Sequence, residues 1–430
     1  MIIILRKKIK GGTLLMYLTE TEKEMQAGSQ GDAVKLAMEI LIRVGDACGA
    51  KSLIPVNSAH IVLAMYKSIY DAGVEICEKF AEMGARFCIP TTLDPSGMDT
   101  EDPDRFKTPS DYKDKQKRVA LAYQKMGAIP IWTCTPYLNG NVPRFGENVG
   151  WTESSAVAFI NTVLGARSNR ETAVLDICIG LTGRTMNYGL HLDENRKGQV
   201  LVNLDLGNRE LKTMEYPVLG YFLGKVLGSR IGVVDGLVGK PTNEQLKSLL
   251  AGAAASGSLA LVHIVGVTPE APTKEAAFGG NIPEETITFT NDGLKLIEDT
   301  MSTVRSGKID FVAVGCPHYT INEIEKVVKL MNGRHVHEGI QFWIYANKLN
   351  VELAERMGYR EILENSGVKI TVETCMLISP VETWGFKTIM TDSAKCAYYA
   401  PMQCKADVVY GGIEECIEVA ISGVLKRGDL

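Results

Sequence analysis

Apolar and polar positions follow two different periods along this chain, most clearly in its last third. Short apolar runs typical of buried strands occur at 309–315, 341–347, 368–374 and 406–410. Segments with helical spacing occur between and after them, at 321–331, 350–367 and 413–425. This alternation predicts repeated β-α units and a parallel, doubly wound sheet. Because such crossovers are almost always right-handed, the carboxyl ends of the strands should meet along one edge.

The first two thirds of the chain repeat the alternation less regularly. Thr19 and Glu22 form a Thr-x-x-Glu helix start before a long amphipathic stretch. Two helical stretches are expected between residues 59 and 85, followed by a strand at 86–93. A polar, proline-containing segment then predicts a surface loop that enters a helix ending near Met126.

Length and composition indicate a globular protein with several lobes. The chain has 430 residues, of which 45% are hydrophobic and 23% charged, and we expect lobes of about 16–165, 166–305 and 306–430. No internal repeat is visible. The net charge of -5 offers no basic surplus for binding nucleic acid, so a small-molecule substrate is the better expectation.

The N-terminus does not resemble an export signal, because residues 1–15 begin apolar and then turn basic. Lys10 to Thr13 can be encoded by a purine-rich ribosome-binding sequence, so we expect Met16 to be the true start. The apolar segment 251–267 is interrupted by His263 and is short for a membrane span, which predicts a buried helix running into a strand. Ten cysteines without the dense spacing of a disulfide scaffold fit a reducing cytoplasm.

Three of the cysteines share one context, since each directly follows a predicted strand: Cys134, Cys316 and Cys375. The others are expected in helices (Cys48, Cys77, Cys416), within strands (Cys88, Cys178) or flanking a tyrosine-rich loop (Cys396, Cys404). Three thiolates from separate lobes could hold zinc in a non-catalytic scaffold, or an iron-sulfur cluster with one exposed iron. The spacing of the cysteines along the sequence does not distinguish a zinc site from a cluster. A further alternative makes Cys316 a nucleophile at a helix N-terminus with His318 as its base.

An ordered set of motifs resembles one known family. The runs are TTLDPSGMD, TCTPY, GWTESSAVAFINTVLGARSNRE, YGLHL, GCPHYTINEIE, ETCM and TDSAKCAYYAP. Together they are similar to the catalytic, or large, subunit of the aconitase X family, over essentially residues 17–430. The resemblance implies an aconitase-like α/β fold with several lobes around a central iron-sulfur site. It also implies a dehydratase of a small hydroxy acid; described members act on cis-3-hydroxyproline or on 5-phosphomevalonate.

The resemblance further implies roles for individual residues. Cys134, Cys316 and Cys375 would ligate a [4Fe-4S] cluster or a smaller form of it. Glu153 and Ser154, at a predicted helix start where backbone N-H groups can hold an anion, would contact substrate. The other substrate-binding positions implied are Asp94, Pro95 and Lys395, the last in a Ser/Thr-rich loop.

The catalytic base is expected on a partner. In aconitase-type enzymes it is a serine on a small swivelling domain, which this chain lacks, so a separate small subunit should supply it. His318 could transfer a proton, and a structural role is equally compatible with its position. His60, Arg184 and His191 stand in family-like segments without a distinct role.

Two differences from the family bear on the substrate. Asp94 stands where phosphomevalonate-type members tend to carry Asn, and a carboxylate repels phosphate but can pair with an ammonium group. The residues after His60 are Ile-Val-Leu-Ala rather than Gly-Val-Ser. Both differences favour a hydroxyproline-like substrate, with phosphomevalonate as the alternative.

Overall fold

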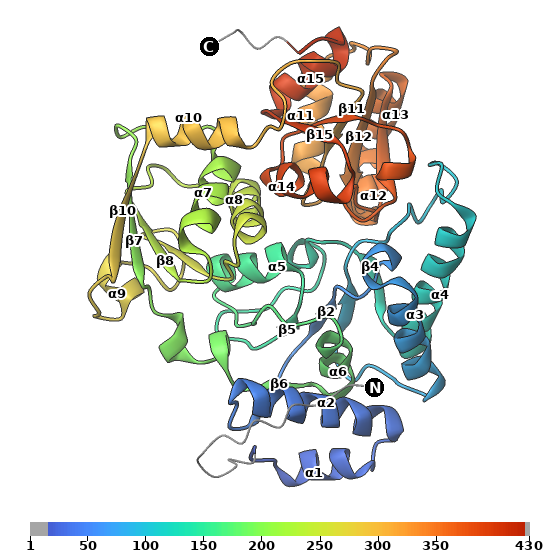
Figure 1. Cartoon of the computed structure of the whole chain (residues 1–430), viewed down its shortest axis with the longest axis vertical. Helices are drawn as coiled ribbons and strands as arrows, with labels where there is room; N and C mark the ends of the chain where they lie inside the picture. The colour runs from blue at the N-terminus through green and yellow to red at the C-terminus, as the bar shows by residue number, and fades with distance from the viewer. Residues whose placement is uncertain (1–15, 426–430) are drawn as a thin grey trace.

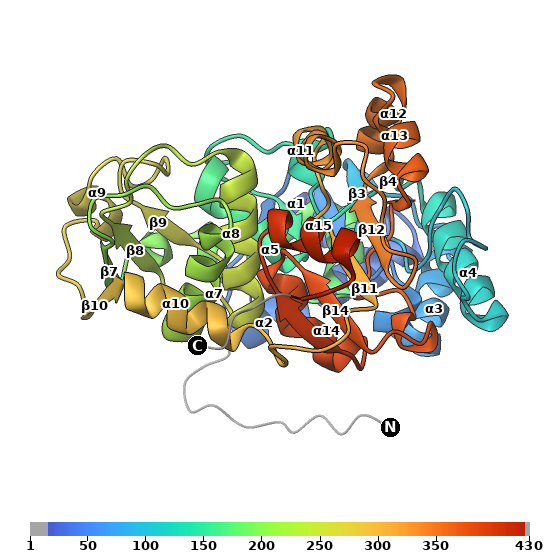
Figure 2. The same ribbon diagram turned by 90° about the horizontal axis from the view of Figure 1, so that it is seen from above.

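The computed structural model describes residues 16–425 as three α/β lobes that pack against one another (Figures 1 and 2). The expectation about residues 1–15 lies outside the described residues. In Figure 1 the first lobe is below and to the right, the second to the left and the third at the top. The α/β class predicted from the sequence is confirmed, and the lobe boundaries near 165 and 305 stay a prediction.

The first lobe is built on a four-stranded parallel sheet. Its strand order is β4 (Ile129–Trp132), β3 (Thr91–Leu93), β2 (Ala59–Ile61) and β5 (Gly150–Trp151). A small antiparallel pair joins β1 (Leu53–Pro55) to β6 (Arg184–Met186). The helices are α1 (Glu20–Ala27), α2 (Asp32–Cys48), α3 (Tyr66–Glu82), α4 (Ser110–Met126), α5 (Ser154–Phe159) and α6 (Leu175–Thr182). The predicted helix start is confirmed, because Thr19 and Glu22 form a reciprocal capping box.

The second lobe has a parallel sheet in the order β10 (Glu285–Thr290), β7 (Val200–Asp205), β8 (Gly232–Asp235) and β9 (Val262–Ile264). Its helices are α7 (Glu215–Leu227), α8 (Asn243–Ser256), α9 (Lys274–Phe278) and α10 (Asn291–Thr300). Helices α7 and α8 approach closely at Gly220, where a Cβ would lie 1.9 Å from the carbonyl oxygen of Leu249. Segment 251–267 runs from α8 into β9, as predicted.

The third lobe has a five-stranded parallel sheet in the order β13 (Val368–Val372), β12 (Gln341–Ala346), β11 (Phe311–Val314), β14 (Thr388–Thr391) and β15 (Asp407–Tyr410). Its helices are α11 (Ile321–Met331), α12 (Lys348–Arg356), α13 (Tyr359–Asn365), α14 (Ala394–Gln403) and α15 (Ile413–Ser422). The strand order reverses between β11 and β14. In open α/β sheets, ligands bind outside the carboxyl ends of the strands at this kind of switch point.

Short helical turns complete the description: η1 (Pro136–Leu138), the π-turn η2 (Ile160–Leu164), η3 (Gly189–His191), η4 (Asp193–Arg196) and η5 (Val381–Thr383). No helix within residues 16–425 is both long and apolar enough to cross a membrane.

Several local predictions were wrong. Cys178 lies in helix α6 rather than in a strand, because a short run buried on every side has no periodicity that separates helix from strand. Cys88 precedes β3, which is shorter than expected. Residues 59–61 form strand β2 instead of a helix, and the two helical stretches are the parts of α3 on either side of a kink at Tyr70.

The tyrosine-rich segment was also misassigned. Lys395 and Cys396 lie in the first turn of helix α14, capped by the Ser393 hydroxyl, and not in a loop, and Cys404 is the residue that ends this helix. Aromatic residues and Pro401 lower the apparent helical propensity of the segment. Its burial against α8 of the second lobe and β15 of its own lobe stabilises the helix despite that composition.

Candidate active site

A cavity of about 210 Å³ lies where the first lobe meets the switch point of the third. Residues that line it are Val62, Met65, Ser68, Asp94, Pro95, Cys134, Glu153, Ser154, Gly315, Cys316, Pro317, Cys375, Leu377, Ile378, Lys395, Tyr399 and Gln403. All the residues proposed from the sequence for substrate or cluster binding are therefore brought together. A larger cavity of about 550 Å³, bordered by residues 152–199 and 229–261, has no cysteine in its lining.

Each of the three thiols that line this cavity comes shortly after the end of a strand. Cys134 follows β4 by two residues, Cys316 follows β11 by two, and Cys375 follows β13 by three. A hydrogen bond with Cys316, followed by burial, raises the pKa of Cys375 well above its ordinary value. Burial likewise raises the pKa of Cys134, whose sulfur accepts a hydrogen bond from the backbone N-H of His318 at 3.3 Å. These two thiols are therefore protonated until a cation displaces the protons.

The three thiols line one cavity without forming a site for a single metal ion. Zinc needs three or four ligands, each within about 2.3 Å of one ion. Within residues 16–425, no group of three Cys, His, Asp or Glu side chains surrounds a single-ion position. Cysteines that bind a cluster attach to different irons and need not converge on one ion. Three thiols around one cavity therefore suit an iron-sulfur cluster.

A buried ion pair forms the anionic and cationic part of the cavity wall. Glu153, the N-cap of α5, accepts hydrogen bonds from the backbone N-H and hydroxyl of Ser155, at 3.1 and 2.7 Å, and from the Lys395 ammonium. Burial alone would raise the pKa of Glu153, but Lys395 and Ser155 together lower it to about 2. Burial lowers the pKa of Lys395, and the attraction of Glu153 outweighs it, so the pKa rises. Both groups are charged at neutral pH.

Asp94 differs from Glu153 in protonation. Burial, followed by the repulsion of Glu153, raises its pKa well above the ordinary value, so the carboxyl holds its proton. Its loop is fixed to the loop of Cys375, because Ser96 N-H donates to the Glu373 carbonyl at 2.8 Å and the Thr374 hydroxyl donates to the Ser96 carbonyl at 2.9 Å. A neutral Asp94 repels phosphate little, which weakens the substrate argument made from the sequence.

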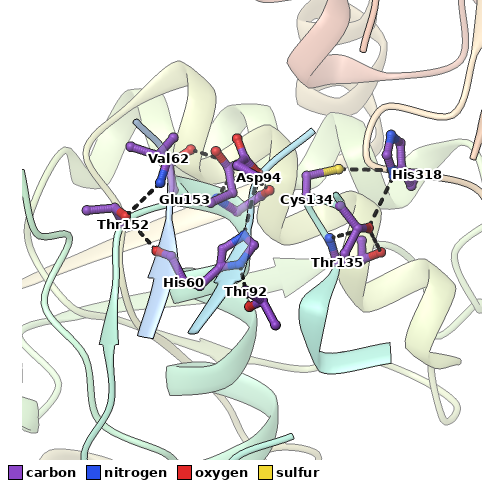
Figure 3. A network of polar contacts seen from close by, with 12 residues as sticks. His60, Val62, Thr92, Asp94, Cys134, Thr135, Thr152, Glu153 and His318 are labelled. Atoms are coloured by element: carbon purple, nitrogen blue, oxygen red, sulfur yellow. Dashed lines mark hydrogen bonds and ion pairs between the residues drawn. The ribbon is translucent and has the colours of Figure 1, made fainter. Parts of the chain in front are cut away.

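His318 lies beside Cys134 (Figure 3) and is not one of the residues that line the cavity. Its two ring nitrogens contact the Thr133 hydroxyl at 3.1 Å and the Thr374 carbonyl at 2.8 Å. Burial lowers its pKa to about 4. Helix α11 begins only at Ile321, so Cys316 is not at its N-terminus. This geometry favours the structural role for His318 over proton transfer, and it does not support a Cys316 nucleophile.

The remaining sequence candidates occupy different places. Arg184 forms an ion pair with Glu22, with Nε and Oε1 3.0 Å apart, and His191 contacts Asn148 at 2.9 Å; neither lines the cavity. His60 is fully buried beside Asp94.

Sequence reasoning did not identify some residues of the wall. Met65 and Ser68 come from the start of α3, and Tyr399 and Gln403 come from α14. No motif distinguishes them, since the lobes bring them together only on folding. Ser155 was also missed, although its position directly after Ser154 at a helix start was a usable signal.

Comparisons with known proteins extend over nearly the whole chain. Three family models match consecutive segments: Aconitase X first domain over residues 15–194, Aconitase X second domain over 198–299 and Aconitase X third domain over 309–422. The crystal structure of Thermococcus kodakaraensis aconitase X (holo-form) is similar with a TM-score of 0.85 and 37% identity, over 94% of this chain and 100% of that chain.

Curated relatives fall into two groups. The phosphomevalonate dehydratase large subunit of Methanocaldococcus jannaschii is 38% identical over 407 residues, which is 94% of this chain and 100% of that protein. The cis-3-hydroxy-L-proline dehydratase of Pseudomonas aeruginosa is 36% identical over 411 residues, which is 95% of this chain and 70% of that protein.

Proposed function

This chain belongs to the aconitase X family, and from that premise we propose that it is the large subunit of an iron-sulfur-dependent hydro-lyase that removes water from a small hydroxy acid. The observation that carries the proposal is the single cavity lined by Cys134, Cys316 and Cys375 together with the Glu153–Lys395 pair. The ten cysteines are free thiols, which supports a location in the reducing cytoplasm.

Cys134, Cys316 and Cys375 would hold the cluster. When bound, a cluster with an open iron supplies a Lewis acid that stabilises the departing hydroxyl and the substrate carboxylate. Side chains of the protein would hold the hydroxy acid in place. Ser154 presents a hydroxyl at the start of α5, and Lys395 provides the positive charge of the described cavity wall.

The charges of the cavity wall favour a zwitterionic substrate. Lys395 is the one cationic side chain in the described lining, and Glu153 already pairs with it. A doubly charged phosphate needs more positive charge than this pair provides, whereas an amino acid can place its carboxylate near Lys395 and its ammonium near Glu153. We therefore favour a hydroxyproline-like substrate. Phosphomevalonate is the second candidate, because relatives with that name show similar identity.

A separate small subunit would complete the enzyme. Relatives matched over their whole length carry the words large subunit in their names. No histidine lines the described cavity, Glu153 is neutralised by Lys395, and Asp94 holds its proton, so the wall offers no free base. We propose that a serine on the small subunit removes the C-H proton, and that alone this chain binds substrate weakly without turnover.

Co-expression with a candidate small subunit tests this function. Anaerobically purified complex should contain iron and sulfide and should dehydrate cis-3-hydroxyproline, with 5-phosphomevalonate assayed in parallel. The isolated chain should retain the cluster and show no turnover. A complex that contains iron and sulfide but dehydrates neither compound would refute the proposed substrates, and full turnover by the isolated chain would refute the placement of the base.

A further inference from the structure

A buried chain of side chains leads from the interior of the first lobe to the cavity (Figure 3). The Asn141 amide donates to the Thr92 hydroxyl at 2.9 Å, and this hydroxyl contacts His60 Nδ1 at 2.9 Å. On the other side of the ring, His60 Nε2 lies 3.5 Å from Asp94 Oδ1. The exposed fractions are 8% for Asn141, 1% for Thr92, 0% for His60 and 4% for Asp94, so water does not compete for these contacts.

The contacts of Thr92 favour one position for the proton of the His60 ring. The Thr92 oxygen accepts a hydrogen bond from Asn141, and its single hydroxyl hydrogen can be donated to one acceptor. The candidates are His60 Nδ1 at 2.9 Å and the Ala59 carbonyl at 3.5 Å, and the shorter contact is the better hydrogen bond. The shorter contact favours Nδ1 as the acceptor of this hydrogen, which places the proton of the neutral ring on Nε2.

That proton faces the Asp94 carboxyl. His60 Nε2 and Asp94 Oδ1 are both buried, and neither has a hydrogen-bond partner elsewhere in the described part of the chain. Among the described residues, their 3.5 Å contact is thus the one polar contact that either atom makes. A closure of about 0.5 Å gives a hydrogen bond of normal length. The second oxygen, Oδ2, forms no hydrogen bond with any described residue and is left for the cavity that Asp94 lines.

We infer that His60 is a positioning residue of the active site, whose Nε2-H holds Asp94 Oδ1 and thereby turns Asp94 Oδ2 toward the substrate. The orientation of Asp94 stands on the contacts alone, and its effect on turnover rests on the proposed function. Packing assists, because the rings of His60 and Trp151 lie 5.6 Å apart and the Thr152 hydroxyl donates to the His60 carbonyl at 2.7 Å. The backbone and ring of His60 are both fixed.

The charge state of His60 agrees with this role. Burial lowers its pKa to about 3, and the more distant Glu153 only partly opposes this. Asp94 and Thr92 are the polar side chains in contact with the ring, and Asp94 is uncharged. His60 should therefore stay neutral throughout the range in which enzymes are assayed.

Imidazole ¹⁵N NMR of the cluster-free chain tests the inference without any activity. The His60 signal is assigned by its loss in His60→Gln. We expect a neutral ring with the proton on Nε2 and no titration between about pH 5 and about pH 9, a range that brackets the usual histidine pKa of roughly 6.5. A ring with the proton on Nδ1, or one that titrates near its usual pKa, would overturn the inference.

Kinetics of the complete enzyme provide the second test. His60→Leu removes the donor and should lower kcat roughly a hundredfold with little change in KM, since misplacing a group by about 1 Å costs that much. His60→Gln, whose amide can reach Asp94, should regain most of the loss. His191→Gln is the matched control, a buried histidine outside the cavity. Equal losses in His60→Gln and His60→Leu would show that the ring only fills space.

Discussion

Replacement of Lys395 tests how much the buried ion pair between Lys395 and Glu153 contributes to stability. In Lys395→Met, Glu153 keeps its hydrogen bonds from Ser155 but loses its only countercharge in the described cavity wall. The side chains of Glu153 and Lys395 are only 10% and 11% exposed, so solvent cannot replace the lost interaction. The variant should therefore be clearly less stable than the wild type.

The size of the expected loss of stability follows from the pKa of Glu153. A fall from 4.5 to about 2 corresponds to about 3 kcal/mol of stability at neutral pH. Because this pKa is depressed in the folded state, the contribution is complete above pH 4.5 and is lost as the pH falls through about 2. At about pH 3, less than half of this contribution remains. Lys395 makes the largest favourable contribution to this shift, so Lys395→Met should cost on the order of 3 kcal/mol at about pH 7 and roughly half of that at about pH 3.

Urea denaturation of the cluster-free chain at both pH values measures this difference. Lys113→Met is the matched control, because Lys113 pairs with Asp104, whose side chain is 83% exposed, and solvent screens that pair. The control should change the free energy of unfolding far less. Equal losses in Lys395→Met and Lys113→Met at neutral pH, or a Lys395→Met effect independent of pH, would refute the reasoning.

Two further predictions concern stability and access. Burial raises the pKa of Glu171 from 4.5 to about 7, so this group should lower the stability of the wild type by up to about 3 kcal/mol as the pH rises through this interval. Burial raises the pKa of Asp176 in the same way, so Glu171→Gln should make the decline in denaturation curves smaller without abolishing it. Lys67 bridges the start of α3 to Glu382 and to the Gln403 carbonyl across the cavity wall. Lys67→Met should therefore speed thiol labelling of Cys316 in cluster-free protein without changing that of Cys48. If Cys316 were labelled at the same rate in the variant and in the wild type, the result would argue against a bridging role.

The cluster candidates could be located from the sequence because strand ends carry recognisable local patterns. Cys134, Cys316 and Cys375 form a group by sequence context alone, since an apolar run followed by a corner is visible within a few residues. The helix start at Glu153 was visible for the same reason. Strand β14, which places Lys395 at the switch point, was missed because Thr388–Thr391 has only four residues with weak apolar character.

Contacts between distant segments could not be predicted in this way. The chain from Asn141 through Thr92 and His60 to Asp94 joins positions up to 81 residues apart along the sequence, from 60 to 141. Each member is an ordinary polar residue in its own segment, and only the parallel pairing of β2 with β3 brings His60 beside Thr92. The charge states of Asp94 and Glu153 likewise depend on burial, which the sequence pattern does not specify.

The central claim is that three specific thiols hold an iron-sulfur cluster. Iron and sulfide analysis of anaerobically purified protein tests it most directly, in the wild type and in five serine variants: Cys134→Ser, Cys316→Ser, Cys375→Ser, Cys48→Ser and Cys416→Ser. Cys48 is exposed and Cys416 is buried, so the two controls cover both environments. We predict that iron and sulfide are lost in the first three variants and retained in the last two. Equal iron content in all five variants, or zinc in place of iron in the wild type, would contradict the account.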